Sequence, residues 1–298
     1  MNSNISWDVY RSFAAVLRAG TLSGAARLLG MTQPSIARHI DALERSLGED
    51  LFVRSQRGLS PTEHALVLQP HAEALVAASA ALERGGRGRP HQAEGVVRIS
   101  ASQTVGVVHL PPILAGLRQA HPALAFELAL SDQIDDLLQR RADVAVRMTE
   151  PVQKALVAKR VGSVQIGFHA HQAYLARRGV PRSLRDLAAH DVIGFDVETA
   201  FTRAAMRSLP DLDRSMFALR VDNDAAQFEA MRAGFGIGIC QTVVARRDPA
   251  LIRVLPDAFD LQLPIWIVMH EDLRRSTRYR VVFDALAEGL KGVAEADV

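Results

Sequence analysis

The sequence predicts a protein of two parts, an N-terminal all-α part ending in a long helix and a larger C-terminal α/β part. Three observations lead to this fold class. Apolar residues recur at helical spacing through the first 84 residues, a glycine-rich segment follows at residues 85–92, and strand-like and helix-like segments alternate from residue 96 onward. The 298 residues are enough for two domains of ordinary size.

Three short helices are expected within the first 48 residues. Residues 7–19 carry apolar side chains at positions i, i+3, i+4 and i+7, and Gly20 is placed to end this helix. Ser23 can cap a second helix that runs to residue 29. Thr32 can cap a third, in which Pro34 is tolerated because the first turn needs no N–H donor.

The second and third of these helices are joined almost directly, with only Gly30 and Met31 between them. A tight turn after a helix of small residues is typical of a helix-turn-helix. The apolar stripe of the third helix, which must face the core, consists of Ile36, Ile40, Leu43 and Leu47. Its polar N-terminal residues then face outward, where they can enter a major groove. The same spacing also fits a helical corner whose polar residues are merely solvated.

A short strand-like run at residues 51–53 follows, and beside the next turn lie two arginines. Guanidinium groups at such a turn can contact phosphates, which positions a protein on DNA without reading its sequence. Glutamine suits adenine, arginine suits guanine, and serine suits either base. The expected DNA-contacting residues are Ser23, Thr32, Gln33, Pro34, Ser35, Arg38, His39, Arg54 and Arg57.

A long helix is expected over residues 62–84. Its stripe follows steps of three and four residues, the 3.5-residue period of helices that pair along a seam. The stripe consists of Ala65, Leu68, Ala72, Leu75, Ser79 and Leu82. We expect this helix to form a homodimer, although a stripe packed against its own domain is the alternative. Pro70 should kink the helix or split it at Gln69.

Residues 85–92, GGRGRPHQ, are the expected linker, and the pattern beyond them changes to alternating strands and helices. Strands are expected at 96–101, 124–130 and 142–147, with helices at 110–120 and 134–140 between them. A second run begins near residue 156 and includes strands at 192–196, 216–221, 236–240 and 265–270 and helices at 225–234 and 278–290. This alternation predicts a doubly wound, mainly parallel sheet.

Composition narrows the class of protein further. Lysine plus arginine number 35 against 33 acidic residues, a balance that neither requires nor excludes nucleic acid. Most of the basic residues are arginine, which suits phosphate recognition but is also common in chains from GC-rich genomes.

Cys240 is the single cysteine, so no intrachain disulfide is expected. No signal-peptide pattern and no uncharged apolar run of about 18 residues occurs, so we expect a cytoplasmic protein without a membrane partner.

Taken together, these motifs resemble the LysR-type transcriptional regulators over nearly the whole chain. The matching stretches are Trp7 with residues 13–62, followed by GVVRIS, LPPILAGLRQAHP, ADVAVR, MRAGFGIGI and LPIWIVMHEDL. The resemblance implies a winged helix-turn-helix, a dimerising linker helix, and a two-lobed effector domain like a periplasmic binding protein. It also implies tetramers built from dimers, with RNA polymerase as a further partner. Ala37 departs from the family pattern, because a serine is usual there.

The expected domains are a winged helix-turn-helix at 1–61, a linker helix and hinge at 62–94, and an effector domain at 95–298. Lobe I is expected at 95–167 and 269–298, and lobe II at 168–268. Ligands of such folds bind at the carboxyl ends of strands. The candidate ligand residues are Ser102, Gln103, Thr104, Arg147, Phe195, Asp196, Asn223 and Gln241.

An anionic inducer such as a carboxylate is favoured by the helix start at residues 102–104 and by Arg147. Alternatives remain: Arg147 can form an ion pair with Glu150 or Asp143, and Asn223 can serve only as a helix cap. A solute-binding protein or an enzyme of two-lobed α/β fold is the alternative function. No catalytic motif, metal-ligand spacing or cofactor fingerprint is found, so we expect no enzyme activity, metal or cofactor.

Overall fold

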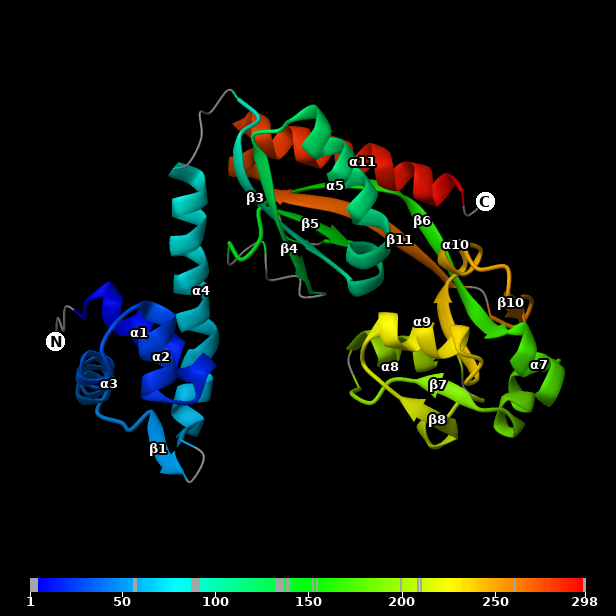
Figure 1. The fold of residues 1–298 in the computed structure, drawn as a ribbon, viewed down its shortest axis with the longest axis horizontal. Helices are drawn as coiled ribbons and strands as arrows, with labels where there is room; N and C mark the ends of the chain where they lie inside the picture. The colour runs from blue at the N-terminus through cyan, green and yellow to red at the C-terminus, as the bar shows by residue number, and fades with distance from the viewer. Residues whose placement is uncertain are drawn as a thin grey trace. The chain divides into compact units, whose positions relative to one another are not determined.

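The chain folds into two compact units. The computed structural model describes residues 5–55, 58–86, 92–131, 137, 140–151, 153, 155–198, 200–207, 209, 211–259 and 261–296. One unit comprises Met1–Arg87 with Leu138–Arg141, and the other comprises Gly88–Leu137 with Ala142–Val298 (Figure 1).

The first unit contains four helices and a hairpin among its described residues. The helices are α1 (Trp7–Ala19), α2 (Leu22–Leu29), α3 (Gln33–Leu47) and α4 (Glu63–Gly86), and the hairpin strands are β1 (Phe52–Ser55) and β2 (Gly58–Pro61). The three N-terminal helices pack around Phe13, Val16, Ala25 and Ile36, which are almost completely buried. The predicted helix-turn-helix is therefore present, and Thr32 caps α3 as expected.

Two local predictions in this unit are wrong. The cap of α2 is Thr21, whose hydroxyl accepts a hydrogen bond from the Gly24 amide at 3.0 Å, whereas Ser23 lies inside the first turn. Leu47 does not continue the buried stripe of α3, since it is 41% exposed. The stripe ends at Leu43 because Gly48, in the left-handed conformation, terminates the helix one residue after Leu47.

The hairpin of β1 and β2 is held tightly against the helices. The amides of Leu51 and Phe52 donate to the Glu44 carboxylate at 2.7 and 3.2 Å, and the Leu59 amide donates to the Gly20 carbonyl at 2.8 Å. Gly58 has a φ of 125°, and a Cβ at this position would come within 2.6 Å of the Gly20 oxygen. Only glycine therefore allows this close approach.

Helix α4 is one continuous helix of 24 residues with Pro70 inside it, so of the two expectations for Pro70, a kink or a split at Gln69, the split does not occur. Its predicted stripe divides between two environments. Ala65 and Ala72 are buried in the core of the first unit, whereas Leu82 is 78% exposed. The alternative of packing on its own domain thus holds for the first half of the stripe. The further large apolar side chains exposed on this helix are Leu66, Val67, Leu75 and Val76.

By length and mean hydropathy alone, α4 also qualifies as a helix that could cross a membrane, which the sequence did not lead us to expect. The sequence prediction considered only apolar runs without any charged residue. Helix α4 did not qualify because every 18-residue window of it contains Glu73. Such a single helix is weak support for a membrane span.

The second unit is built on a nine-stranded sheet formed by its described residues, in the order β4-β3-β5-β11-β6-β9-β7-β8, with β10 paired to β6. These strands are β3 (Gly95–Ala101), β4 (Leu124–Leu130), β5 (Val144–Arg147), β6 (Leu156–His171), β7 (Val192–Gly194), β8 (Phe217–Arg220), β9 (Ile237–Gln241), β10 (Leu251–Val254) and β11 (Leu261–His270). The pairs β3–β4, β3–β5, β7–β8 and β7–β9 are parallel, as expected, whereas β6 and β11 are antiparallel to their neighbours.

Helices cover this sheet and connect its strands. They are η1 (Val105–His109), α5 (Leu110–Ala120), α7 (Gln172–Arg178), η2 (Leu184–Ala189), α8 (Ala200–Arg207), η3 (Arg214–Met216), α9 (Asp224–Arg232), α10 (Thr242–Ala245), η4 (Glu271–Arg275) and α11 (Thr277–Glu295). Helices α5 and α11 lie side by side over the same strands (Figure 1). The helix expected at residues 134–140 falls almost entirely outside the described residues.

The two largest hydrophobic cores among the described residues of this unit lie in different lobes. The core of lobe I contains Val97, Val144 and Leu286, and the core of lobe II contains Tyr174 and Phe217. These side chains come from β3, β5 and α11 in lobe I, and from α7 and β8 in lobe II. The two-lobed effector domain that the resemblance implies is therefore present.

Strands β6 and β11 belong to both lobes. On β6, Val164 packs in the core of lobe I and Phe168 in that of lobe II, close to the expected boundary at 167/168. On β11, Ile265 and Ile267 already pack in lobe I, and Leu263 touches both cores. The chain thus returns from lobe II to lobe I before residue 265, whereas the sequence predicted this boundary at 268/269.

Candidate DNA-binding and effector sites

The N-terminal end of α3 presents a group of polar side chains to solvent. The Thr32 hydroxyl accepts a hydrogen bond from the Ser35 amide at 3.3 Å and lies 2.9 Å from the Ser35 hydroxyl. Arg38 donates from Nη2 to the same Ser35 Oγ at 3.4 Å. Gln33 and Pro34 are exposed beside them. Five of the nine expected DNA-contacting residues therefore share one accessible surface.

His39 has a second role that the sequence did not reveal. Its Nδ1 is hydrogen-bonded at 2.7 Å to the hydroxyl of Ser12, which is completely buried on α1. This bond fixes α3 against α1 and thereby orients the polar surface of α3. Ser12 lies on the same face of its helix as Val9, Phe13 and Val16. A hydroxyl on an apolar face needs a buried hydrogen-bond partner, and this could have indicated a contact such as that with His39 from the sequence.

The remaining expected DNA-contacting residues lie on other elements. Ser23 is exposed in the first turn of α2, and Arg54 is exposed on β1. Arg57 lies outside the described residues. The hydrogen bond between Leu59 and Gly20 fixes the hairpin that carries Arg54 next to the turn after α1.

In the effector domain, the loop after β3 meets the start of α9. Thr104 donates its hydroxyl hydrogen to Asp224 Oδ2 at 2.9 Å, and the Asp224 amide donates to Gln103 Oε1 at 3.0 Å. Gln103 Nε2 also lies 3.5 Å from the Asp222 carbonyl oxygen. Two expected ligand residues of lobe I therefore contact lobe II directly. Ser102 lies between them and β3, and its carbonyl accepts from the Gly106 amide at 2.8 Å.

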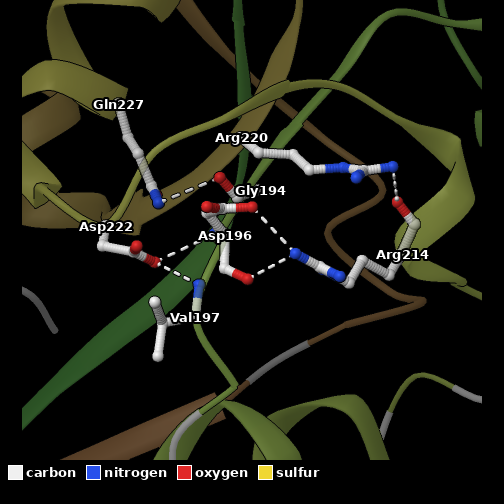
Figure 2. A network of polar contacts seen from close by, with 7 residues as sticks. All are labelled: Gly194, Asp196, Val197, Arg214, Arg220, Asp222 and Gln227. Atoms are coloured by element: carbon white, nitrogen blue, oxygen red, sulfur yellow. Dashed lines mark hydrogen bonds and ion pairs between the residues drawn. The ribbon is translucent and has the colours of Figure 1, made fainter.

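Asp196 lies in a polar network at the end of β7 (Figure 2). Its carboxylate accepts from Arg214 at 2.8 Å, so the aspartate expected to meet a ligand already has a cationic partner. The amides of Asp196 and Val197 both donate to Asp222 Oδ1, at 2.9 and 2.8 Å. Figure 2 also shows Gln227 donating to the Gly194 carbonyl. This network joins the end of β7 to Asp222, Arg214 and Gln227.

Asn223 and Phe195 have structural roles in this part of lobe II. Asn223 Oδ1 accepts from the Ala226 amide at 2.9 Å, so the capping alternative is confirmed. The ring of Phe195 packs edge-on against that of Phe217, with centroids 5.4 Å apart.

Arg147 is buried in lobe I. Its Nη2 donates to Ser100 Oγ at 2.9 Å, and Asp143 accepts a hydrogen bond from the Arg98 amide at 2.8 Å. Arg147 and Asp143 are both buried, so an ion pair at the surface, as the alternative had it, does not describe this arginine. Burial of a guanidinium at the end of β5 requires polar partners, which Ser100 and the Val146 carbonyl supply.

Gln241 makes a buried contact with His109. The two side chains are hydrogen-bonded at 2.7 Å between Oε1 and Nε2, and both are almost fully buried. Arg247 Nη2 approaches His109 Nδ1 at 3.5 Å. His109 lies in the π-helical turn η1, which the sequence pattern did not predict. Gln241 is thus tied to the helical run that begins at Gln103.

Two potentially reactive groups lie next to each other in lobe II. His169 Nδ1 is 3.4 Å from Cys240 Sγ and 3.0 Å from the Gly167 carbonyl oxygen. Burial, with a smaller contribution from the charges of Arg253 and Arg246, lowers the pKa of His169 to about 4. Burial raises the pKa of Cys240 to about 12, which keeps the thiol protonated near neutral pH.

The described residues contain no group of three or more His, Cys, Asp or Glu side chains arranged to hold a metal ion. A surface hollow of about 350 Å³ lies in lobe II and is lined by residues 180–182 and 253–258. None of the eight expected ligand residues lines this hollow.

Comparison with known proteins covers both parts of the chain. The pattern described as "Bacterial regulatory helix-turn-helix protein, lysR family" matches residues 7–66, and that described as "LysR substrate binding domain" matches residues 90–291. A similar protein is the "Probable HTH-type transcriptional regulator LtrA" of Klebsiella pneumoniae, 26% identical, with 97% of this chain and 96% of the relative aligned.

Solved structures show the same fold. CrgA, a LysR-type transcriptional regulator from Neisseria meningitidis, aligns over 96% of this chain and 99% of its own with 24% identity and a TM-score of 0.59. The Vibrio cholerae virulence activator AphB aligns over 95% and 99% with 22% identity and a TM-score of 0.63. Because the two family patterns together cover most of the sequence, the chain belongs to the LysR family of bacterial helix-turn-helix transcriptional regulators.

Proposed function

We propose that this regulator binds promoter DNA through α3 and that a small anionic molecule bound between the lobes of its effector domain sets its activity. The observation that carries the proposal is the polar, accessible N-terminal end of α3, the second helix of the helix-turn-helix. The same chain carries a LysR-type substrate-binding domain. Family membership supports the general role. The contacting residues and the chemistry of the inducer are our assignment.

In the proposed DNA complex, α3 enters the major groove with its N-terminal end leading. Gln33, Ser35 and Arg38 then read base edges, because their side chains are accessible there. Arg54, together with Arg57, contacts the phosphate backbone from the hairpin. Ala37 lacks the hydroxyl usual in relatives, so the base contacted there should differ.

We further propose that α4 pairs with the α4 of a second copy of this chain. Ala65, Leu68 and Ala72 pack on the first unit, yet Val67, Leu75 and Leu82 lie on the exposed surface of the same helix. These three follow steps of eight and seven residues, the spacing of side chains two turns apart. A second copy would remove this apolar surface from water. Dimers that pair again would give the tetramer.

The inducer is proposed to bind where the loop after β3 faces lobe II. Ser102 and Thr104 offer hydroxyl groups beside a helix start, where free amides and the helix dipole favour an anion. Binding changes activity only if the ligand prefers one arrangement of the lobes over another. The favoured arrangement would then alter the spacing of the DNA-binding units, and RNA polymerase is the proposed further partner at the promoter. We propose that the regulator acts in the cytoplasm.

A solute-binding protein or an enzyme of two-lobed fold is the alternative, and the relatives argue against both, because they are named as transcriptional regulators. A gel-shift assay with the DNA upstream of the chain's own gene separates these functions. We expect specific retardation that weakens steeply with salt, because phosphate contacts release counterions. Equal retardation of random duplex would contradict sequence-specific binding.

Ligand response needs a second assay. A thermal-shift screen of small metabolites should find an anion that stabilises the protein, since a ligand at 100 times its Kd adds about 2.7 kcal/mol. The same anion should change the DNase footprint. An unchanged footprint with a bound anion would contradict the proposed switch and leave the DNA-binding assignment intact.

A further inference from the structure

We propose that Asp224 is a tethered competitor of the inducer: its carboxylate occupies the position at Thr104 that an anionic inducer would take. This inference rests on the proposed function, because it concerns the same effector site. It adds a residue that determines which ligands can bind and how tightly they do so.

The central observation is one hydrogen bond between residues 120 positions apart. Thr104 Oγ1 donates to Asp224 Oδ2 at 2.9 Å. Thr104 belongs to the helical run that follows β3 in lobe I, and Asp224 is the first residue of α9 in lobe II. A hydroxyl donating to a carboxylate is a charge-assisted hydrogen bond, the same bond that Thr104 would donate to a carboxylate ligand.

Helix capping does not account for the position of this carboxylate. Asn223 already caps α9 through its bond to the Ala226 amide. The backbone amide of Asp224 donates to Gln103 Oε1 at 3.0 Å, so Gln103 holds the main chain while the carboxylate reaches the neighbouring Thr104. Two consecutive lobe I residues therefore bind one lobe II residue.

The neighbouring carboxylates differ from Asp224 in their partners. Asp196 is paired with Arg214 at 2.8 Å. Asp222 Oδ1 accepts two backbone amides on the far side of the β7 end (Figure 2). Both are bound within lobe II. The Asp224 side chain, by contrast, is hydrogen-bonded to Thr104 of the other lobe.

Two consequences follow for the ligand. An anion must displace a carboxylate that the fold holds at Thr104, so this hydrogen bond lowers the apparent affinity of the site for the anion. A neutral acceptor must also displace this carboxylate from Thr104, whereas a cation is attracted to the carboxylate and need not replace it. When an anion binds, it exchanges one contact between the lobes for a contact with itself, which links occupancy to the lobe arrangement.

Two variants of the full-length chain test this inference because they break the same hydrogen bond from opposite ends. Asp224→Ala removes the competitor and keeps the Thr104 donor. Thr104→Val removes the donor with little change in shape, and Thr104→Ser restores it. The probes are the sodium salts of acetate, succinate, citrate and phenylacetate at constant ionic strength, with phenylacetamide and phenethylamine as the neutral and cationic partners of phenylacetate. Binding is measured by thermal shift and calorimetry.

We expect at least one carboxylate to bind Asp224→Ala about tenfold more tightly than wild type, because the tethered group no longer competes. The same carboxylate should not bind Thr104→Val and should bind Thr104→Ser. Glu229→Ala is the matched control, since it removes a negative charge from the same helix at a side chain bound to Arg232. It should leave carboxylate binding at the wild-type level.

Two results would overturn the inference. In one, no panel carboxylate binds Asp224→Ala better than wild type. In the other, Asp224→Ala and Thr104→Val change binding in the same direction, as a bond that only holds the lobes together would require. Gel shifts without ligand test the regulator proposal separately. If the wild-type chain does not bind its upstream DNA specifically, the regulator proposal is contradicted, whatever the two variants do to carboxylate binding.

Discussion

Arg38 lies on the accessible surface of α3, where its Nη2 approaches Ser35 Oγ at 3.4 Å and no acidic side chain within the described residues pairs with it. A guanidinium so placed can turn to a guanine edge at little cost. We predict that Arg38→Ala lowers affinity for the operator by about 1–3 kcal/mol and affinity for random duplex by less. Competition gel shifts with both duplexes measure this difference.

The matched control for this prediction is Arg45→Ala on the same helix. Arg45 is also exposed, but it lies in the last turn, where its Nε donates to the Asp41 carbonyl at 3.0 Å. Its removal costs the same charge without removing a side chain from the N-terminal end. Equal losses of discrimination in both variants would show that Arg38 does not read a base.

His169 provides a prediction of pH dependence. Burial lowers its pKa from 6.5 to about 4, so between these values the unfolded chain binds a proton that the folded chain does not. The stability that comes from the neutral imidazole is complete above pH 6.5 and is lost as the pH falls toward 4. By about pH 5 the free energy of unfolding should fall by about 2 kcal/mol from this group alone.

Urea unfolding near pH 7.5 and near pH 5 tests this prediction. His169→Gln should be less stable than wild type at neutral pH and should lose about 2 kcal/mol less on acidification, because the titrating group is absent. His64→Gln, at an exposed position in α4, should keep the wild-type difference. An unchanged difference for His169→Gln would mean that other groups cause the acid sensitivity.

At the scale of the element, periodicity and capping signals predicted the N-terminal helices to within a few residues. Local chemistry decides these boundaries, as the left-handed Gly30, with a φ of 65°, illustrates at the turn before α3. Long-range contacts decide what the sequence missed. The hydroxyl of Ser12 and the π-helical turn with His109 acquire their roles from partners 27 and 132 residues away. No local pattern identifies such partners.

Helix α4 carries the prediction for assembly. The sequence placed one stripe along it, but the first unit covers only part of that stripe and leaves Leu75 and Leu82 exposed. We predict that Leu75→Glu combined with Leu82→Glu converts the dimer to monomers, because each buried leucine contributes about 1.5–3 kcal/mol. Analytical ultracentrifugation measures the change, and circular dichroism should detect no loss of folded structure.

Charge alone must be separated from loss of the apolar surface. His64→Glu adds a negative charge to α4 at an exposed position near its start and should leave the dimer unchanged. Monomers in this control, or dimers in the double variant, would contradict pairing through the exposed leucines.

At the scale of the whole molecule, the alternation of strands and helices predicted the parallel part of each lobe. It did not predict that β6 and β11 pass between the lobes antiparallel to their neighbours, because an apolar run does not specify the direction in which it pairs. The candidate ligand residues were chosen at strand ends. Sequence could not tell that Thr104 and Gln103 contact Asp224, since those contacts depend on how the lobes pack.

The separate cores predict how the whole chain unfolds. Phe13 lies in the core of the first unit and Phe168 in that of lobe II, and the two cores share no residue. We therefore expect two calorimetric transitions rather than one, because units with separate cores need not unfold together. Phe13→Ala should lower the midpoint temperature of only one transition, and Phe168→Ala that of only the other. Each substitution should reduce the free energy of unfolding of its own unit by about 3–5 kcal/mol. If α4 pairs two chains, the transition sensitive to Phe13 should also rise with protein concentration. A single transition that both variants lower equally would mean that the two units unfold as one.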